Sequence, residues 1–348
     1  MFMKYSIALT LVKGLSPKIL NQVYALDQNE KELFEKIAQN YRCNVNKTLD
    51  RASQIIEDCL ENNIQIINQK DKHYPKLLLN CIDRPHVIYQ KGIKHINHIP
   101  CISIVGTRSN TKYGLEITNE IVATLNRFKV GIVSGLAYGI DIIAHRKAID
   151  LNIPNFAVLG SGHLQIYPKN HQKEIEQILE IGAIISEFPP KSKPTKYNFP
   201  KRNRIIAGVS QSTVVVESKK KGGSLITAQI AGSYDREVYA VPGNINSPSS
   251  EGCNQLVKNN LAILLQDMEQ ITEELKPNAC FNEKIIKNKL SNEEEKVFSF
   301  VLDNQPVHAD RIAFFLKYNP SKLYAFLTQM ELDLLIIKKP GNYYVTSQ

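Results

Sequence analysis

The segment Cys101-Ile-Ser-Ile-Val-Gly-Thr-Arg108 decides the fold of this 348-residue chain. It is a short apolar run that ends at a glycine, and a helical segment follows it. The pattern recurs, and the predicted strands are Ile102–Val105, Gly131–Ser134, Phe156–Leu159, Ala183–Ser186, Thr213–Glu217, Val238–Val241 and Ala262–Leu265. Short β-branched strands that alternate with helices predict an α/β fold with a doubly wound parallel sheet. The strands are apolar on both faces, as burial between two helix layers requires.

Glycines, hydroxyls and cations follow four of these strands, at the sheet edge where ligands bind in open α/β folds. Glycine allows a tight turn there, and a helix N-terminus presents free N–H groups. The candidate binding residues in these loops are Gly106, Thr107, Arg108, Ser134, Gly135, Lys169, Lys221, Gly222, Gly223 and Ser224. The loops match neither the dinucleotide fingerprint nor the nucleoside-triphosphate loop. Their convergence on one edge nevertheless predicts a ligand that carries phosphate.

A strongly basic stretch runs from Lys191 to Arg204 and contains no acidic residue. Cations neutralise phosphates, and an aromatic ring among them offers a base a surface for stacking. This combination indicates binding of a single strand rather than readout of base edges in a duplex groove. The candidates here are Lys196, Phe199, Lys201, Arg202, Asn203 and Arg204. The alternative is a solvated basic loop without a ligand.

Asp141 and His145 stand four residues apart and therefore share one face of a predicted helix. One interpretation is an acid–base pair or half of a metal site. The other is an internal hydrogen bond that anchors the helix. Because no nucleophile is paired with a base and no metal-ligand cluster is evident, the sequence predicts no catalytic residue, no cofactor and no metal.

The composition agrees with an anionic partner. The formal net charge is +9 and the pI about 9.0, while tryptophan is absent, so stacking must rely on Phe, Tyr or His. The six cysteines form no C-x-x-C pair, which indicates reduced thiols of a cytoplasmic protein. No signal peptide is recognisable and no apolar run is long enough to span a bilayer, so no membrane is expected.

Three domains are expected. Residues 1–68 contain only short amphipathic helices and form a helical domain, either a packing module or a helix-hairpin-helix-like one. The sheet occupies residues 69–275. Residues 285–348 open with a capping-box-like Ser291, continue with three predicted helices, and end in two short strands, the outline of a winged helix. The third of these helices, 320–332, contains one cation, Lys322, which favours a protein contact or a structural role over DNA binding.

The sequence resembles the DprA/Smf family, DNA-processing protein A, over roughly residues 70–266. The matching text is Gly106-Thr-Arg, Tyr113-Gly114, Ser134-Gly-Leu-Ala, Gly139-Ile-Asp, Ala144-His145, Tyr167-Pro168, Ser186-Glu187, Phe199, Arg202-Asn-Arg-Ile-Ile-Ala-Gly208, Val216-Glu217, Gly223-Ser-Leu-Ile-Thr-Ala228, Val241-Pro-Gly243 and Gly252-Cys-Asn-Gln-Leu. By this motif, Arg108 and the segment with Lys196, Phe199 and Arg202 occupy positions expected to hold the strand. Gly222 departs from the serine usual in the family, and Asn259-Asn260 replaces the common Gly-Ala.

The resemblance implies an extended Rossmann fold that binds single-stranded DNA without sequence preference. It further implies loading of RecA recombinase onto that DNA in natural transformation and recombination, homodimerisation, and no enzymatic turnover. Single-strand-binding protein is a further expected partner. We expect the dimer contact near Gln255 and Leu264, where a short helix leads into the last apolar strand at the sheet edge.

Two other functions are compatible with parts of the sequence. Glu217 and the Gly222-Gly-Ser loop are similar to the acid and glycine loop of nucleotide phosphoribohydrolases, although the characteristic Pro-Gly-Gly-x-Gly-Thr loop is missing. Alternatively, the protein is a regulatory scaffold whose winged helix makes the main contact with duplex DNA.

Overall fold

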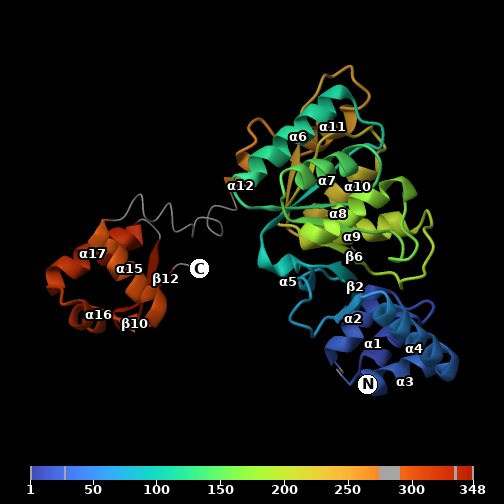
Figure 1. The fold of residues 1–348 in the computed structure, drawn as a ribbon, viewed down its shortest axis with the longest axis horizontal. Helices are drawn as coiled ribbons and strands as arrows, with labels where there is room; N and C mark the ends of the chain where they lie inside the picture. The colour runs from blue at the N-terminus through green and yellow to red at the C-terminus, as the bar shows by residue number, and fades with distance from the viewer. Residues whose placement is uncertain (1, 27–28, 274–290, 333–334, 347–348) are drawn as a thin grey trace. The chain divides into compact units, whose positions relative to one another are not determined.

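The computed structural model describes residues 2–26, 29–273, 291–332 and 335–346 (Figure 1). The chain forms two compact units, Met1–Glu273 and Glu274–Gln348. The predicted division between residues 68 and 69 lies inside the first unit, and the predicted boundaries at 275 and 285 lie outside the described residues, as does Cys280. These domain limits therefore stay predictions. None of the described helices is both long and apolar enough to cross a membrane.

The N-terminal segment is helical, as the sequence predicts. Its helices are α1 (Phe2–Thr10), α2 (Pro17–Leu26), α3 (Glu30–Asn40) and α4 (Val45–Glu61). Asn29 and Asn44 cap α3 and α4 by accepting from backbone N–H groups of the first turn. The turn after α1 contains Gly14 at φ +85°, a conformation that favours glycine. The helices enclose a core around Ile7, Leu9 and Phe34.

A nine-stranded sheet forms the centre of the first unit. Its strands are β1 (Gln65–Asn68), β2 (Val87–Gly92), β3 (Cys101–Val105), β4 (Gly131–Ser134), β5 (Asn155–Val158), β6 (Ala183–Ser186), β7 (Ser212–Val215), β8 (Glu237–Ala240) and β9 (Ile263–Leu264). The order is β1-β2-β6-β5-β4-β3-β7-β8-β9. From β6 to β9 all neighbours are parallel, which confirms the predicted doubly wound sheet. The sequence missed β1 and β2, which pair antiparallel and extend the sheet beyond β6.

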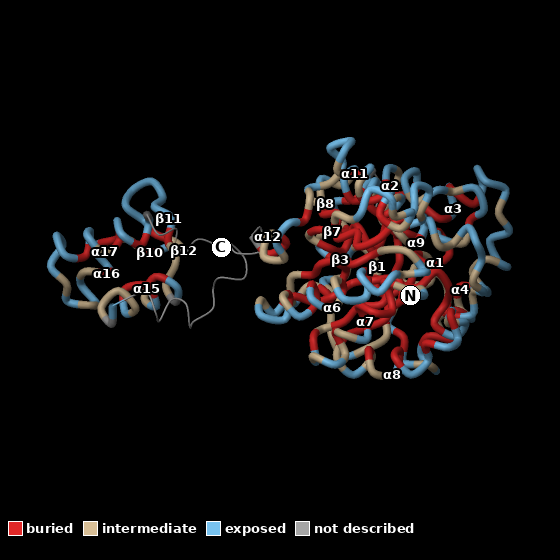
Figure 2. The backbone as a smooth tube through the Cα atoms, turned by 90° about the horizontal axis from the view of Figure 1, so that it is seen from above, coloured by how far each residue is buried: buried red, intermediate tan, exposed pale blue. Residues whose placement is uncertain are grey.

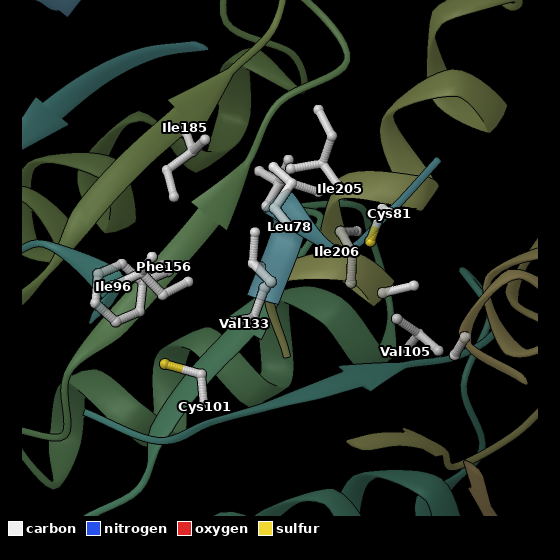
Figure 3. Close-up of a cluster of buried hydrophobic side chains, with 14 of the residues drawn as sticks. Leu78, Cys81, Ile96, Cys101, Val105, Val133, Phe156, Ile185, Ile205 and Ile206 are labelled. Carbon is white, nitrogen blue, oxygen red and sulfur yellow. The ribbon is translucent and has the colours of Figure 1, made fainter. Parts of the chain in front are cut away.

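Helices cover both faces of the sheet, and the strands between them are buried (Figure 2). The helices that follow the strands are α5 (Lys76–Leu79), α6 (Lys112–Asn126), α7 (Ile140–Asp150), α8 (Gln172–Ile181), α9 (Asn198–Val209), α10 (Gly223–Ser233), α11 (Glu251–Lys258) and α12 (Gln270–Glu273). One core joins α5, α9 and α10 to the sheet and contains Leu78, Ile205 and Ile206 (Figure 3). A second, around Ile142 and Ile178, joins α7 and α8 to the other face.

Strand β3 is the point at which the chain direction across the sheet reverses. From β3 the chain proceeds through β4 and β5 to β6 on one side, and it then returns to start β7 on the other side of β3. The loops after β3 and β7 therefore diverge from adjacent strands and leave a crevice at their carboxyl ends. This is the place where open α/β sheets bind ligands.

The second unit contains α15 (Asn292–Asn304), β10 (Val307–His308), α16 (Ala309–Leu316), α17 (Pro320–Leu332), β11 (Ile336–Lys339) and β12 (Tyr343–Thr346). Ser291 and Glu294 form the predicted capping box at the start of α15. The three helices and the final two strands lie where the sequence predicts them, and β10 adds a third strand in the order β10-β12-β11. Lys322, the one cation of α17, lies 2.7 Å from Glu293 of α15.

Candidate nucleic-acid interface

A cleft of about 620 Å³ lies at the carboxyl ends of β3 and β7. Its walls are the loop after β3, the loop between β7 and α10, and the segment 194–203 that leads into α9. The structure brings together most of the predicted binding residues here, namely Gly106, Thr107, Arg108, Lys196, Phe199, Arg202, Asn203, Lys221, Gly222, Gly223 and Ser224. Two glycine-containing loops and one basic stretch were predicted separately as binding segments, and all three line this cleft.

The backbones of the two loops hold each other in place. The N–H of Thr107 donates to the carbonyl of Glu217 at 2.8 Å, and the N–H of Val216 donates to the carbonyl of Val105 at 3.0 Å. Gly106 permits a close approach to α7, because a Cβ there would lie 2.5 Å from Cγ1 of Ile140. The cleft rim is therefore fixed by backbone contacts before any ligand binds.

The cleft is strongly cationic. Of the described residues that line it, the charged ones are Arg108, Lys196, Arg202, Lys219, Lys221 and Asp141. Arg108, Lys196 and Lys221 are exposed, so their charges are available to phosphates. Asp141 is buried, and burial raises its pKa while the neighbouring Arg202 opposes that shift. Lys169 and Lys201 are exposed but do not line the cleft.

Phe199 is half-buried and already has partners. A Cβ on Gly160 would lie 2.9 Å from Cδ1 of Phe199, so the ring packs against the Gly160 backbone. The guanidinium of Arg108 lies 5.5 Å from the ring centroid, and the Tyr167 ring lies 5.9 Å away at 57°. Phe199 therefore belongs to an aromatic and cationic cluster rather than standing alone in the basic stretch.

Four of the predicted contact residues are buried and have partners in the protein interior. Arg202 is 4% exposed, and its guanidinium donates to the carbonyls of Gly135 and Val158. Arg204 is buried as well, where it pairs with Glu187 and donates to the carbonyl of Asp83.

Ser134 is fully buried and donates to the carbonyl of Ile104 at 2.6 Å. Gly135 is buried too, and a Cβ there would lie 2.3 Å from the Arg202 guanidinium. The polar groups of these residues already bind or pack against other groups inside the protein. We therefore assign supporting roles instead of ligand contacts to Ser134, Gly135, Arg202 and Arg204.

The start of α10 explains the departure at Gly222. A Cβ at this position would lie 2.1 Å from the hydroxyl oxygen of Ser218, so a serine side chain would have to displace that hydroxyl. The hydroxyl of Ser218 accepts from that of Ser224 at 2.9 Å. A serine at position 222, which the family resemblance implies, would therefore compete with the Ser218 hydroxyl for the same space.

Asp141 and His145 make separate contacts. Asp141 accepts from the N–H of Gly135 at 3.1 Å. The Nδ1 of His145 lies 2.6 Å from Oδ1 of Asn155, and burial lowers the pKa of His145 to about 4. Within the described ranges, no three His, Cys, Asp or Glu side chains lie close enough together to hold a metal ion. Both side chains anchor α7, which agrees with the structural interpretation of the pair.

The acid that a hydrolase would require is engaged elsewhere. Glu217 is 2% exposed, and its carboxylate accepts from the N–H of Thr111 at 2.9 Å and from the Thr111 hydroxyl at 2.5 Å. A Cβ on Gly114 would lie 2.3 Å from the same carboxylate, so α6 packs directly against it. Glu217 thus fastens the start of α6 to the end of β7.

The predicted dimer residues lie at one end of the sheet. Among the strands that the structure describes, β9 pairs only with β8, so it is an edge strand of this sheet, as predicted. Gln255 is exposed on α11 and Leu264 is half-buried in β9. Leu261 and Ile263 are 49% and 43% exposed beside them, two apolar side chains that the sequence analysis had not singled out. Asn260 adopts φ +54°, a conformation that asparagine tolerates.

Sequence reasoning also missed aromatic and apolar residues of the cleft. Tyr167 and Ile226 line it and are 44% and 41% exposed. Tyr197 follows Lys196 and is 69% exposed, with Lys196 Nζ 5.2 Å from its ring centroid. The dipeptide Tyr167-Pro168 was visible as a motif, but only the fold shows that it meets Phe199.

Comparison with known proteins places the chain among DNA-processing proteins. Residues 65–276 match the family model of DNA recombination-mediator protein A. Protein Smf of Escherichia coli is 41% identical over 214 residues, which are 61% of this chain and 57% of that protein, so the match spans less than two thirds of its length. Protein Smf of Synechocystis is 35% identical over 76% of this chain and 70% of its own.

Two solved structures are similar in fold. DNA processing protein A from Streptococcus pneumoniae superposes with a TM-score of 0.66 at 30% identity, over 78% of this chain and 97% of that one. The protein of the same name from Helicobacter pylori, described for its single-stranded DNA binding mode, gives a TM-score of 0.56 at 27% identity, over 62% and 97% of the two chains.

Proposed function

Because the chain belongs to the DNA recombination-mediator protein A family, we propose that its cleft binds single-stranded DNA without sequence preference. The observation that carries the proposal is the cationic, ring-bearing cleft at the point where the strand order reverses. The single-stranded DNA binding described for the Helicobacter pylori protein supports it. The exposed cations Arg108, Lys196 and Lys221 neutralise phosphates, and the rings beside them receive bases.

Sequence independence follows from the kind of contacts available. Arginine and lysine heads bind backbone phosphates, which are the same at each nucleotide. Stacking on a ring accepts any base, since every base has a π face. Fluorescence anisotropy with labelled oligonucleotides of equal length and different sequence tests this directly. The proposal expects affinities within about tenfold of one another, whereas specific sites gain 10³-fold or more over non-specific binding.

We further propose that the bound strand is handed to RecA recombinase, with single-strand-binding protein as a further partner, in DNA uptake and recombination. The support is family membership together with the cationic cleft described above. RecA filament assembly on strands coated with single-strand-binding protein is the measurement. The proposal expects faster assembly when this protein is added.

The homodimer remains part of the proposal, with its contact at β9 and α11. An edge strand with exposed Leu261 and Ile263 invites a self-complementary partner. Two clefts on one long strand would also gain avidity. Leu264→Glu, examined by light scattering, should yield a folded monomer that loads RecA poorly. If the Leu264→Glu variant is a monomer that loads RecA normally, dimerisation is not part of the mechanism. If the variant is still a dimer, the contact lies elsewhere.

A further inference from the structure

Two exposed tyrosine rings lie beside the cleft, outside the predicted binding residues. Tyr138, in the loop between β4 and α7, is 42% exposed, and Tyr167, in the segment after β5, is 44% exposed. Both line a small recess together with Arg108 and Phe199. Both rings therefore lie next to the Arg108 side chain at the edge of the cleft.

Tyr167 makes the aromatic surface continuous with the cleft. It lines the cleft as well as the recess, and its ring centroid lies 5.9 Å from that of Phe199. Since Gly160 and Arg108 occupy much of the Phe199 ring, Tyr167 and Tyr138 offer more open ring surface. A strand leaving the cleft past Phe199 would therefore meet Tyr167 first and Tyr138 beyond it.

The Tyr138 ring is held in a fixed orientation. It packs edge-on against His171, with ring centroids 5.0 Å apart at 71°. His171 is 3% exposed, and its Nδ1–H donates to the carbonyl of Leu136 at 2.9 Å. A ring that is ordered before binding loses little conformational entropy when a base stacks on it.

The loop that carries Tyr138 is tied to the loop that carries Arg108. Gly139 adopts φ +78°, and a Cβ there would lie 2.2 Å from the carbonyl oxygen of Thr107. Leu136 lies in the left-handed region at φ +59° at the other end of the loop. The exposed Lys169 comes two residues after Tyr167 and places a cation close to that tyrosine along the chain.

We propose that Tyr138 and Tyr167 form a second base-stacking site, which receives the nucleotides adjacent to those in the cleft. The inference rests on the proposed binding of single-stranded DNA and extends it by assigning the path of the strand from the cleft across the ends of β4 and β5. The site discriminates little among bases because it offers ring faces and no hydrogen-bond pattern.

The test compares short and long single strands. The full-length protein and the variant Tyr138→Ala are titrated with oligothymidines of about 5 and about 20 nucleotides, the shorter near the lower end of single-strand site sizes. Tyr138 lines the recess but not the cleft, so we expect the variant to bind the longer strand roughly 10-fold more weakly and the shorter strand nearly as the wild type does. Tyr138→Phe should retain wild-type affinity, because the ring remains. Tyr41→Ala, which removes a ring of 39% exposure from the end of α3, is the control for general loss of a tyrosine.

Two results would overturn the second site. Undiminished binding of the longer strand by Tyr138→Ala would show that this ring carries no base, and an equal loss for both lengths would make Tyr138 part of the cleft. If the wild type bound neither oligothymidine, the proposed function itself would fail, so the two failures are distinguishable. Thermal unfolding of each variant confirms that it is folded before titration.

Discussion

Lys191 Nζ lies 2.7 Å from Oδ1 of Asp58, which joins the basic segment before α9 to the helix α4. The Asp58 side chain is 5% exposed, whereas that of Lys191 is 64% exposed. The Asp58 hydrogen bond is the main cause that raises the Lys191 pKa. The N-terminal helices thus brace the segment that carries Lys196 into the cleft.

The first prediction tests whether the ion pair between Lys191 and Asp58 positions the basic segment. It uses a substitution for which loss of the charge and loss of the anchor would change the affinity for DNA in opposite directions. Asp58→Asn removes a negative charge, so charge alone would strengthen binding of a polyanion. We expect the opposite, a loss of affinity for single-stranded DNA of roughly 2- to 5-fold, because the segment loses its anchor. Glu57→Gln, an exposed acid on the same helix, is the matched control and should bind as well as or better than wild type. Tighter binding by Asp58→Asn would show that the ion pair does not position the segment.

The second prediction concerns the phosphate anchors. Arg108→Ala and Lys196→Ala should each weaken binding to all sequences about equally and reduce the slope of log K against log salt by about 1. Titrations at several salt concentrations measure both effects. The control is Lys47→Ala, which removes an exposed cation of α4 that lies far along the chain from the cleft residues. If folded Arg108→Ala protein shows the same slope of log K against log salt as the wild type, Arg108 does not contact phosphate and the loop after β3 has a structural role only.

The third prediction distinguishes Arg202 from its exposed neighbour Lys201. Burial lowers the pKa of Arg202 to about 10, and the neighbouring Asp141 opposes that shift. The Arg202 guanidinium donates hydrogen bonds to two backbone carbonyls. Arg202→Met should lower the free energy of unfolding by about 3 kcal/mol, since a buried charged donor is lost and its acceptors are left unpaired. Lys201→Met should change it by no more than about 0.5 kcal/mol. Urea unfolding gives both values, and a fully stable Arg202→Met variant would refute the supporting role.

The fourth prediction is a loss of stability in mild acid. Burial lowers the pKa of His86, His145 and His163 from 6.5 to about 4 in each case. As the pH falls below 6.5 the unfolded chain binds protons that the folded protein does not, so stability is full above 6.5 and decreases towards pH 4. Each histidine contributes a slope of about 1.4 kcal/mol per pH unit in that window.

Urea unfolding at about pH 7.5 and about pH 5 measures this loss. His145→Gln should have a shallower pH dependence than the wild type, because it removes one of the three imidazoles whose pKa burial lowers to about 4. Equal stability of the wild type at both pH values would contradict the burial of neutral histidines.

The parallel strands could be predicted because burial on both faces leaves nearly continuous apolar runs such as Cys101–Val105, in which Ser103 is the one polar residue. The antiparallel strands could not. Gln65–Asn68 has an exposed or half-exposed residue at three of four positions, and Val87–Gly92 follows a proline-containing connector without a turn signal. Their strand character comes from pairing with each other and with β6, which is a tertiary effect.

The composition of the site was predictable, but the direction of its side chains was not. The basic stretch contains six cations, and sequence does not show which of them point inward. The helical phase of α9 places Arg202 on the same side as Ile206 and Val209, whereas Lys201 faces solvent. Buried arginines are rare unless paired, so charge alone suggested surface contacts for Arg202 and Arg204.

The central claim is that the cleft binds a single strand through phosphates and exposed base faces. Its most direct test is the affinity of the full-length protein for one labelled oligonucleotide, measured alone and annealed to its complement at the same salt concentration. The account predicts clearly tighter binding of the single strand, because a duplex hides its base faces from Phe199 and the neighbouring rings. Equal affinity for the two forms, or preference for the duplex, would contradict it.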